Sequence, residues 1–158
     1  SLSAGLPLTG KGHGVNFADL ADDGRLHLLV ASGGLYPGDL ESTAVYRPTT
    51  RPARYLAVRL IGTRSNRDAL GARLTLWVEG RASTRHVAGG SGFGWAPTRQ
   101  HFGLGEARTA GPLVVHWPSG LEERIETLPS NASIEITEGR AASWRTVSKE
   151  DSTDVSTG

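Results

Sequence analysis

The sequence predicts an all-β protein: an antiparallel β-sandwich or jelly-roll-like domain preceded by one short pair of strands. Three observations favour this fold class. Short apolar or alternating segments recur along the chain, and each is bounded by turn residues. The chain of 158 residues contains 21 glycines and few aromatic residues, as expected of a turn-rich β protein. No segment has the periodicity and end signals of a convincing helix.

The N-terminal region, residues 1–50, is predicted to hold a strand pair and a connecting loop. Residues 12–20 alternate as a short strand, with Val15 and Phe17 on one face. Residues 26–31 form a more apolar second strand after a turn. The following segment has scattered Pro, Gly and Thr residues, so it is predicted to be a loop.

The main domain is predicted at residues 51–147, with a disordered tail at 148–158 because that end is rich in Ser, Thr, Asp and Gly. Glu79-Gly80 and Pro118-Ser119-Gly120 have the chemistry of hairpin turns. Trp117 is expected to fill core space before the second turn. The predicted strands are 55–61, 72–78, 83–87, 113–117, 122–128, 132–137 and a short edge at 143–147.

Composition argues against several classes of function. The chain has no cysteine, which removes disulfides, thiolate metal sites and cysteine nucleophiles. Its formal net charge of +1 argues against a nucleic-acid partner. No apolar run approaches the roughly 20 residues that span a bilayer, so no membrane span is expected. The first residues lack the features of a signal peptide, and without any methionine the chain is expected to be a processed form or a fragment.

Polar residues at 65–73 make the first candidate site. Asn66 and Asp68 favour a local turn because such side chains bond to neighbouring backbone groups. Arg73 lies in an apolar strand, so it either faces solvent or pairs with Asp68 or Glu79. One hypothesis is that Asn66, Arg67, Asp68 and Arg73 form a polar corner that fixes loop geometry. The alternative is that they bind a carboxylate or a sugar.

A glycine-rich loop at residues 89–97 carries two aromatic side chains, Phe93 and Trp95. It lacks the Lys-Ser/Thr ending of a phosphate-binding loop, and no helix follows. The two rings either stack on a sugar or a partner surface or fold over the edge of the sandwich. The sequence leaves both alternatives open.

Histidines supply the other candidate chemistry. His101 is a candidate acid, base or ligand, although no serine elbow or metal-binding helix accompanies it. His86, His101 and His116 would form a three-histidine metal site if their strands were neighbours. The favoured alternative is that His101 is buried and donates to a backbone carbonyl.

Residues 19–27 resemble the calcium loop of an FG-GAP repeat, a blade-like element of β-propellers. Asp19, Asp23 and Gly24 match that pattern, while Ala21 and His27 stand where carboxylates are expected. Calcium affinity depends on the charge and number of oxygen ligands, and two of the four carboxylates are missing. The sequence therefore favours a β-turn whose Asp side chains cap backbone amides, with Ca²⁺ binding as the alternative.

The order of motifs in the main domain resembles the ASPIC/UnbV domain. The motifs are residues 65–73, the glycine-rich turn, His101-Phe102-Gly103-Leu104-Gly105, and Trp117-Pro118-Ser119-Gly120. The resemblance implies the C-terminal domain of FG-GAP propellers and of cartilage-acidic-protein-like proteins, with upstream blades missing from this chain. It also implies an extracellular, periplasmic or cell-surface location and a protein or glycan partner there.

These observations lead to three functional hypotheses. The first is a non-enzymatic exported binding or interaction module, because no catalytic set was found. The second is an accessory domain that binds glycans or small ligands through Trp95, Phe93 and the corner at residues 66–73. The third is a metal-dependent secreted enzyme built on the histidines or on Asp19 and Asp23.

Overall fold

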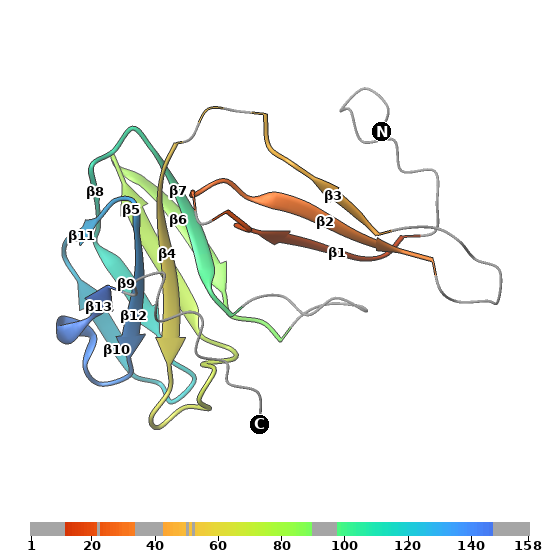
Figure 1. Cartoon of the computed structure of the whole chain (residues 1–158). Helices are drawn as coiled ribbons and strands as arrows, with labels where there is room; N and C mark the ends of the chain where they lie inside the picture. Colours follow the sequence, from red (N-terminus) through yellow and green to blue (C-terminus); the bar gives the residue numbers. More distant parts are fainter. Residues whose placement is uncertain are drawn as a thin grey trace. The chain divides into compact units, whose positions relative to one another are not determined.

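The computed structural model describes residues 12–21, 23–33, 43–49, 51, 53–89 and 98–146 (Figure 1). The chain divides into two compact units, one of Ser1–Pro52 with Gly89–Pro97 and one of Ala53–Ala88 with Thr98–Gly158. The predicted tail at 148–158 lies outside the described residues.

The first unit contains a three-stranded antiparallel sheet in the order β1-β2-β3. Its strands are β1 (Gly12–Ala18), β2 (His27–Ser32) and β3 (Ala44–Tyr46). The first two confirm the predicted pair, and Val15 and Phe17 share an exposed face as expected. The third strand falls in the segment predicted as a loop, so that prediction was wrong there. Three residues are too few to show the alternation that identifies a strand.

The second unit confirms the predicted sandwich: two four-stranded sheets enclose one core. One sheet has the order β10-β9-β5-β6 and the other β13-β12-β4-β7, with a small β11-β8 pair beside them. The strands of the first sheet are β5 (Arg73–Val78), β6 (Arg81–His86), β9 (Leu113–His116) and β10 (Glu122–Ile125). Those of the second are β4 (Arg54–Ile61), β7 (Gln100–Gly105), β12 (Ala132–Thr137) and β13 (Arg145–Thr146). The small pair is β8 (Thr109–Ala110) and β11 (Leu128–Pro129).

Strand pairing is antiparallel except between β4 and β12, which run parallel. Parallel neighbours need a long crossover connection. Here that connection contains every strand of the β10-β9-β5-β6 sheet. In sequence, this whole sheet therefore lies between two neighbouring strands of the other sheet. An antiparallel sandwich is therefore the correct prediction for most pairs, and this central pair is the exception.

The core is made by the inward residues of both sheets, which alternate with more exposed ones on β5 and β7, whereas β4, β9 and β12 each bury three residues in a row. On β5, Leu74 and Leu76 are fully buried, while Arg73 is exposed and Thr75 is half-buried. Full burial of such a side chain contributes about 1.5–3 kcal/mol. Because of this alternation, the face of β5 that carries Arg73 and Thr75 is the one available to a partner.

The structure also contains strands that the sequence analysis missed. The segment forming β7 was treated only as a histidine motif, because Gly103 and Gly105 interrupt its pattern. The predicted Glu79-Gly80 turn is confirmed: both residues have positive φ, 48° and 78°, as a type I′ hairpin turn requires.

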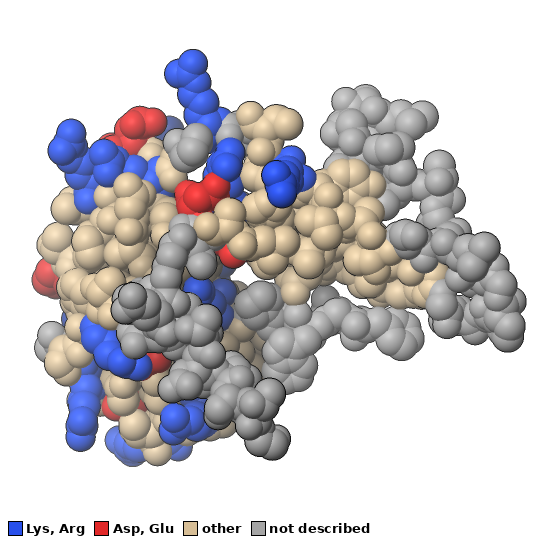
Figure 2. Space-filling model, in the orientation of Figure 1, with Lys and Arg blue, Asp and Glu red and all other residues tan. Residues whose placement is uncertain are grey.

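Charge is spread over the surface, and Figure 2 shows basic and acidic side chains interspersed on the face seen there. This agrees with the net charge of +1. Among the described residues, no helix has the length and apolar character needed to cross a membrane.

Candidate functional site

The polar corner predicted at residues 65–73 is organised by Glu138, which the sequence analysis did not identify. Glu138 is only 2% exposed. Its Oε2 accepts hydrogen bonds from the backbone N–H groups of residues 63, 64 and 65, with N···O distances of 2.7 to 2.8 Å. Its Oε1 accepts from the hydroxyls of Ser65, at 2.9 Å, and Ser119. One carboxylate therefore joins the end of β12 to the loop after β4 and the turn after β9.

Glu138 is held in its ionised form. Burial raises its pKa, but hydrogen bonds from the Ser119 hydroxyl, from the Ser65 and Thr63 amides and from the Ser65 hydroxyl outweigh burial. They lower the pKa from 4.5 to about 2. Successive backbone N–H groups form a cradle that suits an anion, and here the anion is the protein's own side chain. The donors of this cradle are therefore already used.

Asn66 closes the loop that follows. Its Oδ1 accepts from Leu70 N–H at 2.8 Å, and its Nδ2 donates to the Leu70 carbonyl at 2.9 Å. A Cβ added to Gly62 would lie 2.1 Å from the Asn66 carbonyl oxygen, so only glycine fits there. The polar groups of Asn66 thus serve loop geometry, as the first of the two hypotheses for this corner states. Arg67 and Asp68 are exposed in the same turn.

The predicted hairpin after β9 is confirmed and belongs to the same corner. Trp117 N–H donates to the Leu121 carbonyl, Gly120 N–H donates to the Trp117 carbonyl, and Gly120 has a φ of 88°. Trp117 is 3% exposed, and its indole N–H donates to Glu123 at 2.7 Å. The tryptophan fills core space as expected.

The three histidines do not meet. His101 lies on β7 in one sheet, half-buried and stacked on Tyr55 with ring centroids 5.6 Å apart. His86 and His116 lie in the other sheet, on the strands either side of β5. Within the part of the chain that the structure describes, no three His, Cys, Asp or Glu side chains gather as a metal-binding group. His101 was expected to be buried, and the structure shows it half-buried.

The strand register instead forms a polar row on the outer face of the β10-β9-β5-β6 sheet. Arg73 pairs with His86 on one side and His116 on the other, and His116 pairs with Glu122. His116 Nδ1 lies 3.1 Å from Glu122 Oε2. Arg73 faces solvent, which is one of the two placements predicted for its side chain. No ion pair between described residues joins it to Asp68 or Glu79.

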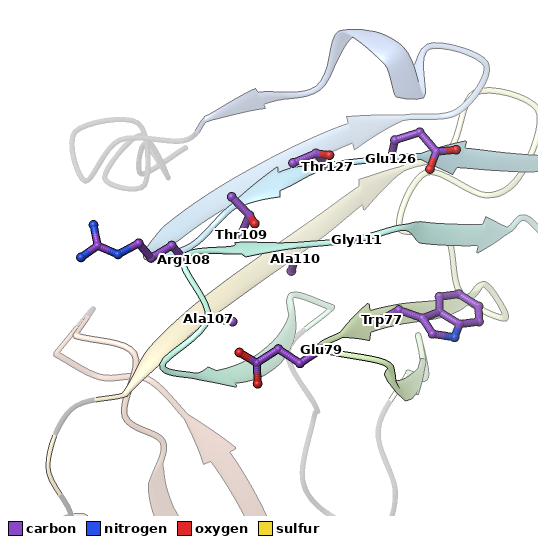
Figure 3. Close-up of a pocket in the computed structure, with 9 residues that line it drawn as sticks. All are labelled: Trp77, Glu79, Ala107, Arg108, Thr109, Ala110, Gly111, Glu126 and Thr127. Atoms are coloured by element: carbon purple, nitrogen blue, oxygen red, sulfur yellow. The ribbon is translucent and has the colours of Figure 1, made fainter.

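A cavity of about 310 Å³ opens where β5 ends, and its lining combines an aromatic ring with charged and hydroxyl side chains (Figure 3). Trp77 is half-buried there and is held by backbone bonds to Gly111 and Pro112. In Figure 3, Trp77 and Glu126 lie toward one end of the cavity, with Glu79 and Arg108 toward the other. The remaining lining residues are Ala107, Thr109, Ala110, Gly111 and Thr127. Such a lining suits a polar, hydroxylated ligand.

The Asp19 turn has the capping geometry that the sequence favours. Asp19 accepts from the backbone N–H groups of Asp23, at 3.1 Å, and Gly24, at 2.7 Å. Asp23 accepts from the Arg25 N–H at 3.0 Å and from the Arg25 guanidinium. The hydrogen bond from the Arg25 side chain lowers the pKa of Asp23.

Two arginines and a histidine lie beside this turn. A cavity of about 400 Å³ is lined by Arg25, His27 and Arg47 together with Leu20, Ala21, Val45 and Pro48. Calcium needs several oxygen ligands and net negative charge. The two described carboxylates already accept from amides and a guanidinium, so these residues do not fit a calcium site.

Two predicted site residues, Phe93 and Trp95, lie outside the described residues. The remaining ones are dispersed: Asn66, Arg67 and Asp68 in the corner, Arg73 on the outer face, and His101 in the other sheet. Glu138 and Trp77 were missed. Glu138 precedes a glycine and belongs to no motif, and Trp77 lies in a predicted strand whose outward face is set only by register.

Comparison with protein families gives one match. The model of the family described as ASPIC and UnbV matches residues 62–143, which include the Asn66 loop, the histidine strand β7, the Trp117 hairpin and Glu138. A search of curated proteins found no match.

Proposed function

Because the chain belongs to the ASPIC and UnbV family, we propose that it is a non-enzymatic, exported binding module, the C-terminal domain of an FG-GAP propeller-type adhesion or matrix-like protein. On this proposal the protein works in the extracellular space, the periplasm or at the cell surface. Upstream propeller blades precede it, and its partner is a surface protein or glycan. The N-terminal strand pair is then part of the last FG-GAP repeat.

The observation that carries this proposal is the Glu138 corner. Ser65 and Ser119, one from each of the motifs at residues 65–73 and 117–120, bond to one internal carboxylate and to each other, and Asn66 bonds to the Leu70 backbone. Groups so engaged are not free to activate a nucleophile or transfer a proton. These groups stabilise the domain, so we assign recognition to the exposed surfaces of that domain.

The test combines binding with turnover. The purified chain is immobilised, and its saturable binding to outer-surface extracts and to a polysaccharide panel is measured. Its turnover of chromogenic ester, phosphate and glycoside substrates is measured in parallel. We expect saturable binding and no turnover. Turnover that is lost when His101 or His116 is replaced by Asn would contradict the proposal, as would recovery of the full-length protein in the cytoplasmic fraction alone.

A second candidate function is a glycan-binding accessory domain, and the cavity beside Trp77 favours it. Indole rings contribute a broad apolar face that suits a sugar ring, and the neighbouring carboxylates and hydroxyls suit its hydroxyl groups. A glycan array separates the two candidates. Signals on defined glycans that disappear in W77A support the second, whereas binding only to protein components supports the first.

A metal-dependent enzyme remains the third hypothesis. Neither the histidines nor the Asp19 turn supplies it with a donor cluster among the described residues.

A further inference from the structure

We propose that the outer face of the β10-β9-β5-β6 sheet binds an acidic polysaccharide, with Arg73 between His86 and His116 receiving the acid group and Trp77 receiving a sugar ring. This inference rests on the proposed binding role and names the ligand class and the surface. The recognised chemistry is a carboxylate or sulfate group carried on a hydroxylated chain.

The register brings one guanidinium and two imidazoles together. Arg73 lies directly opposite His86 on β6 and His116 on β9, and cross-strand partners in a sheet point to the same face. Neighbouring strands lie about 4.7–4.9 Å apart, so the three side chains stand side by side. Because Leu74 on the same strand is fully buried in the core, the Arg73 row faces outward.

The row offers an anion the guanidinium of Arg73, which has no carboxylate partner among the described residues. The one carboxylate in the row, Glu122, lies 3.1 Å from His116 Nδ1. For Arg73, which is exposed, no ion pair or hydrogen bond of its guanidinium is found within the described ranges. A guanidinium binds carboxylate or sulfate oxygens through two parallel N–H groups, and a flanking imidazole adds a further N–H donor.

The rest of the face suits a sugar chain more than a peptide. Next to the row, Thr75 and Thr84 bring their hydroxyls within 3.2 Å of each other across the strands, and both can bond to sugar hydroxyls. Val114 beside them is 8% exposed, so the floor of this face offers no deep apolar pocket for a peptide side chain. An extended peptide would more readily add to a sheet edge than lie across its face.

Trp77 extends the face along the same strand. It follows Arg73 by four residues, a spacing of about 13 Å in an extended strand, and it points to the same side. Trp77 is also among the residues that line the cavity of about 310 Å³ in Figure 3. The Arg73 row and Trp77 are therefore two ends of one surface, far enough apart to contact different sugar units of one chain.

The experiment uses matched polymers and the whole chain at physiological ionic strength. Biolayer interferometry measures binding to dextran, dextran sulfate, polygalacturonate, its methyl ester and poly-glutamate. We expect binding to dextran sulfate, polygalacturonate or both, and much weaker binding to the uncharged partner of each pair. The polymer that binds identifies sulfate or carboxylate as the acid group. Equal binding to poly-glutamate would indicate that the partner is an acidic protein and not a glycan, and it would overturn the inference.

Variants locate the site. R73Q is expected to weaken binding about tenfold, as loss of a bidentate charged contact does, with smaller losses in H86Q and H116Q. R67Q is the matched control, since it removes the same charge from an exposed turn of the same domain. An equal loss in R67Q would show diffuse attraction and contradict the site. W77F reports the ring contact with little change in packing.

Failure of this inference is distinguishable from failure of the proposed function. If none of the acidic polymers binds, the outer-face site is wrong. The binding module itself still stands if the chain binds outer-surface extracts or neutral glycans saturably. If those also give no signal, the binding role fails as well.

Discussion

The Glu138 corner and the outer face of the β10-β9-β5-β6 sheet have opposite characters. The corner holds the most recognisable residues of the sequence, and its described donors and acceptors are paired around a carboxylate that is 2% exposed. The outer face takes only Arg73 from the motif at residues 65–73, and it presents this exposed guanidinium between two imidazoles. The comparison teaches that most of a family's signature can serve to build the domain, while the surface that we propose for recognition draws mainly on residues outside it.

Energetics explain why the corner dominates the pattern. A buried carboxylate is costly unless hydrogen bonds to its oxygens offset the loss of hydration. Every donor to Glu138 is therefore constrained in type or position, which ties Ser65 and Ser119 to the same carboxylate. Exposed side chains such as Arg73 carry no such constraint from folding, because substitutions there change stability little.

The largest expected effect comes from breaking the corner. In E138Q, an amide NH₂ replaces one of the two acceptor oxygens, so either the backbone N–H groups or the serine hydroxyls lose their acceptor, and the negative charge that strengthens the other hydrogen bonds is lost. We expect the free energy of unfolding to fall by about 3 kcal/mol or more. Urea denaturation followed by tryptophan fluorescence measures it, and E138D tests whether the charge alone is sufficient.

The matched control for E138Q is E126Q. Glu126 is an exposed carboxylate whose described hydrogen bonds come from Arg124, so its replacement should leave the urea midpoint nearly unchanged. If E138Q behaved like E126Q, the corner would not be the stabilising centre described above.

The second prediction concerns acid. The folded-state pKa of Glu138, about 2, lies below its ordinary value of 4.5, so its contribution is present above pH 4.5 and is lost as the pH falls toward 2. The loss amounts to about 3 kcal/mol, because one pKa unit corresponds to about 1.36 kcal/mol. Urea midpoints measured between pH 7 and pH 2 should fall steeply below pH 4.5. In E138Q the curve should be flatter, and a parallel fall in both proteins would contradict this assignment.

Much of the fold could be predicted from the sequence because alternation and turn chemistry are local. The strands around Val58, Leu74 and Ile134 show their buried faces directly, and Glu79-Gly80 identifies its own turn. The parallel pairing of β4 with β12 could not be predicted, since nothing local distinguishes a parallel neighbour from an antiparallel one. β7 was missed because its glycines hide the alternation.

The candidate site was less predictable, because it depends on register. That Arg73 stands between His86 and His116 follows only from the pairing of three strands. The same limit explains why His101 appeared as a partner of the other two, when it lies in the opposite sheet. Glu138 was missed since a single glutamate before a glycine has no pattern, and its role arises from contacts more than 70 residues away in sequence.

The smallest expected effect is on the outer face, and it completes the comparison. R73Q, H86Q and H116Q should each change the free energy of unfolding by no more than about 0.5 kcal/mol, because these side chains lie outside the core. Leu74, the next residue on β5, points the other way and is fully buried, so L74A should cost about 2–5 kcal/mol. Two neighbouring positions on one strand thus separate stability from recognition. A destabilisation by R73Q that approached that of L74A would mean that the outer face is part of the scaffold, and that any loss of polysaccharide binding in this variant reports unfolding.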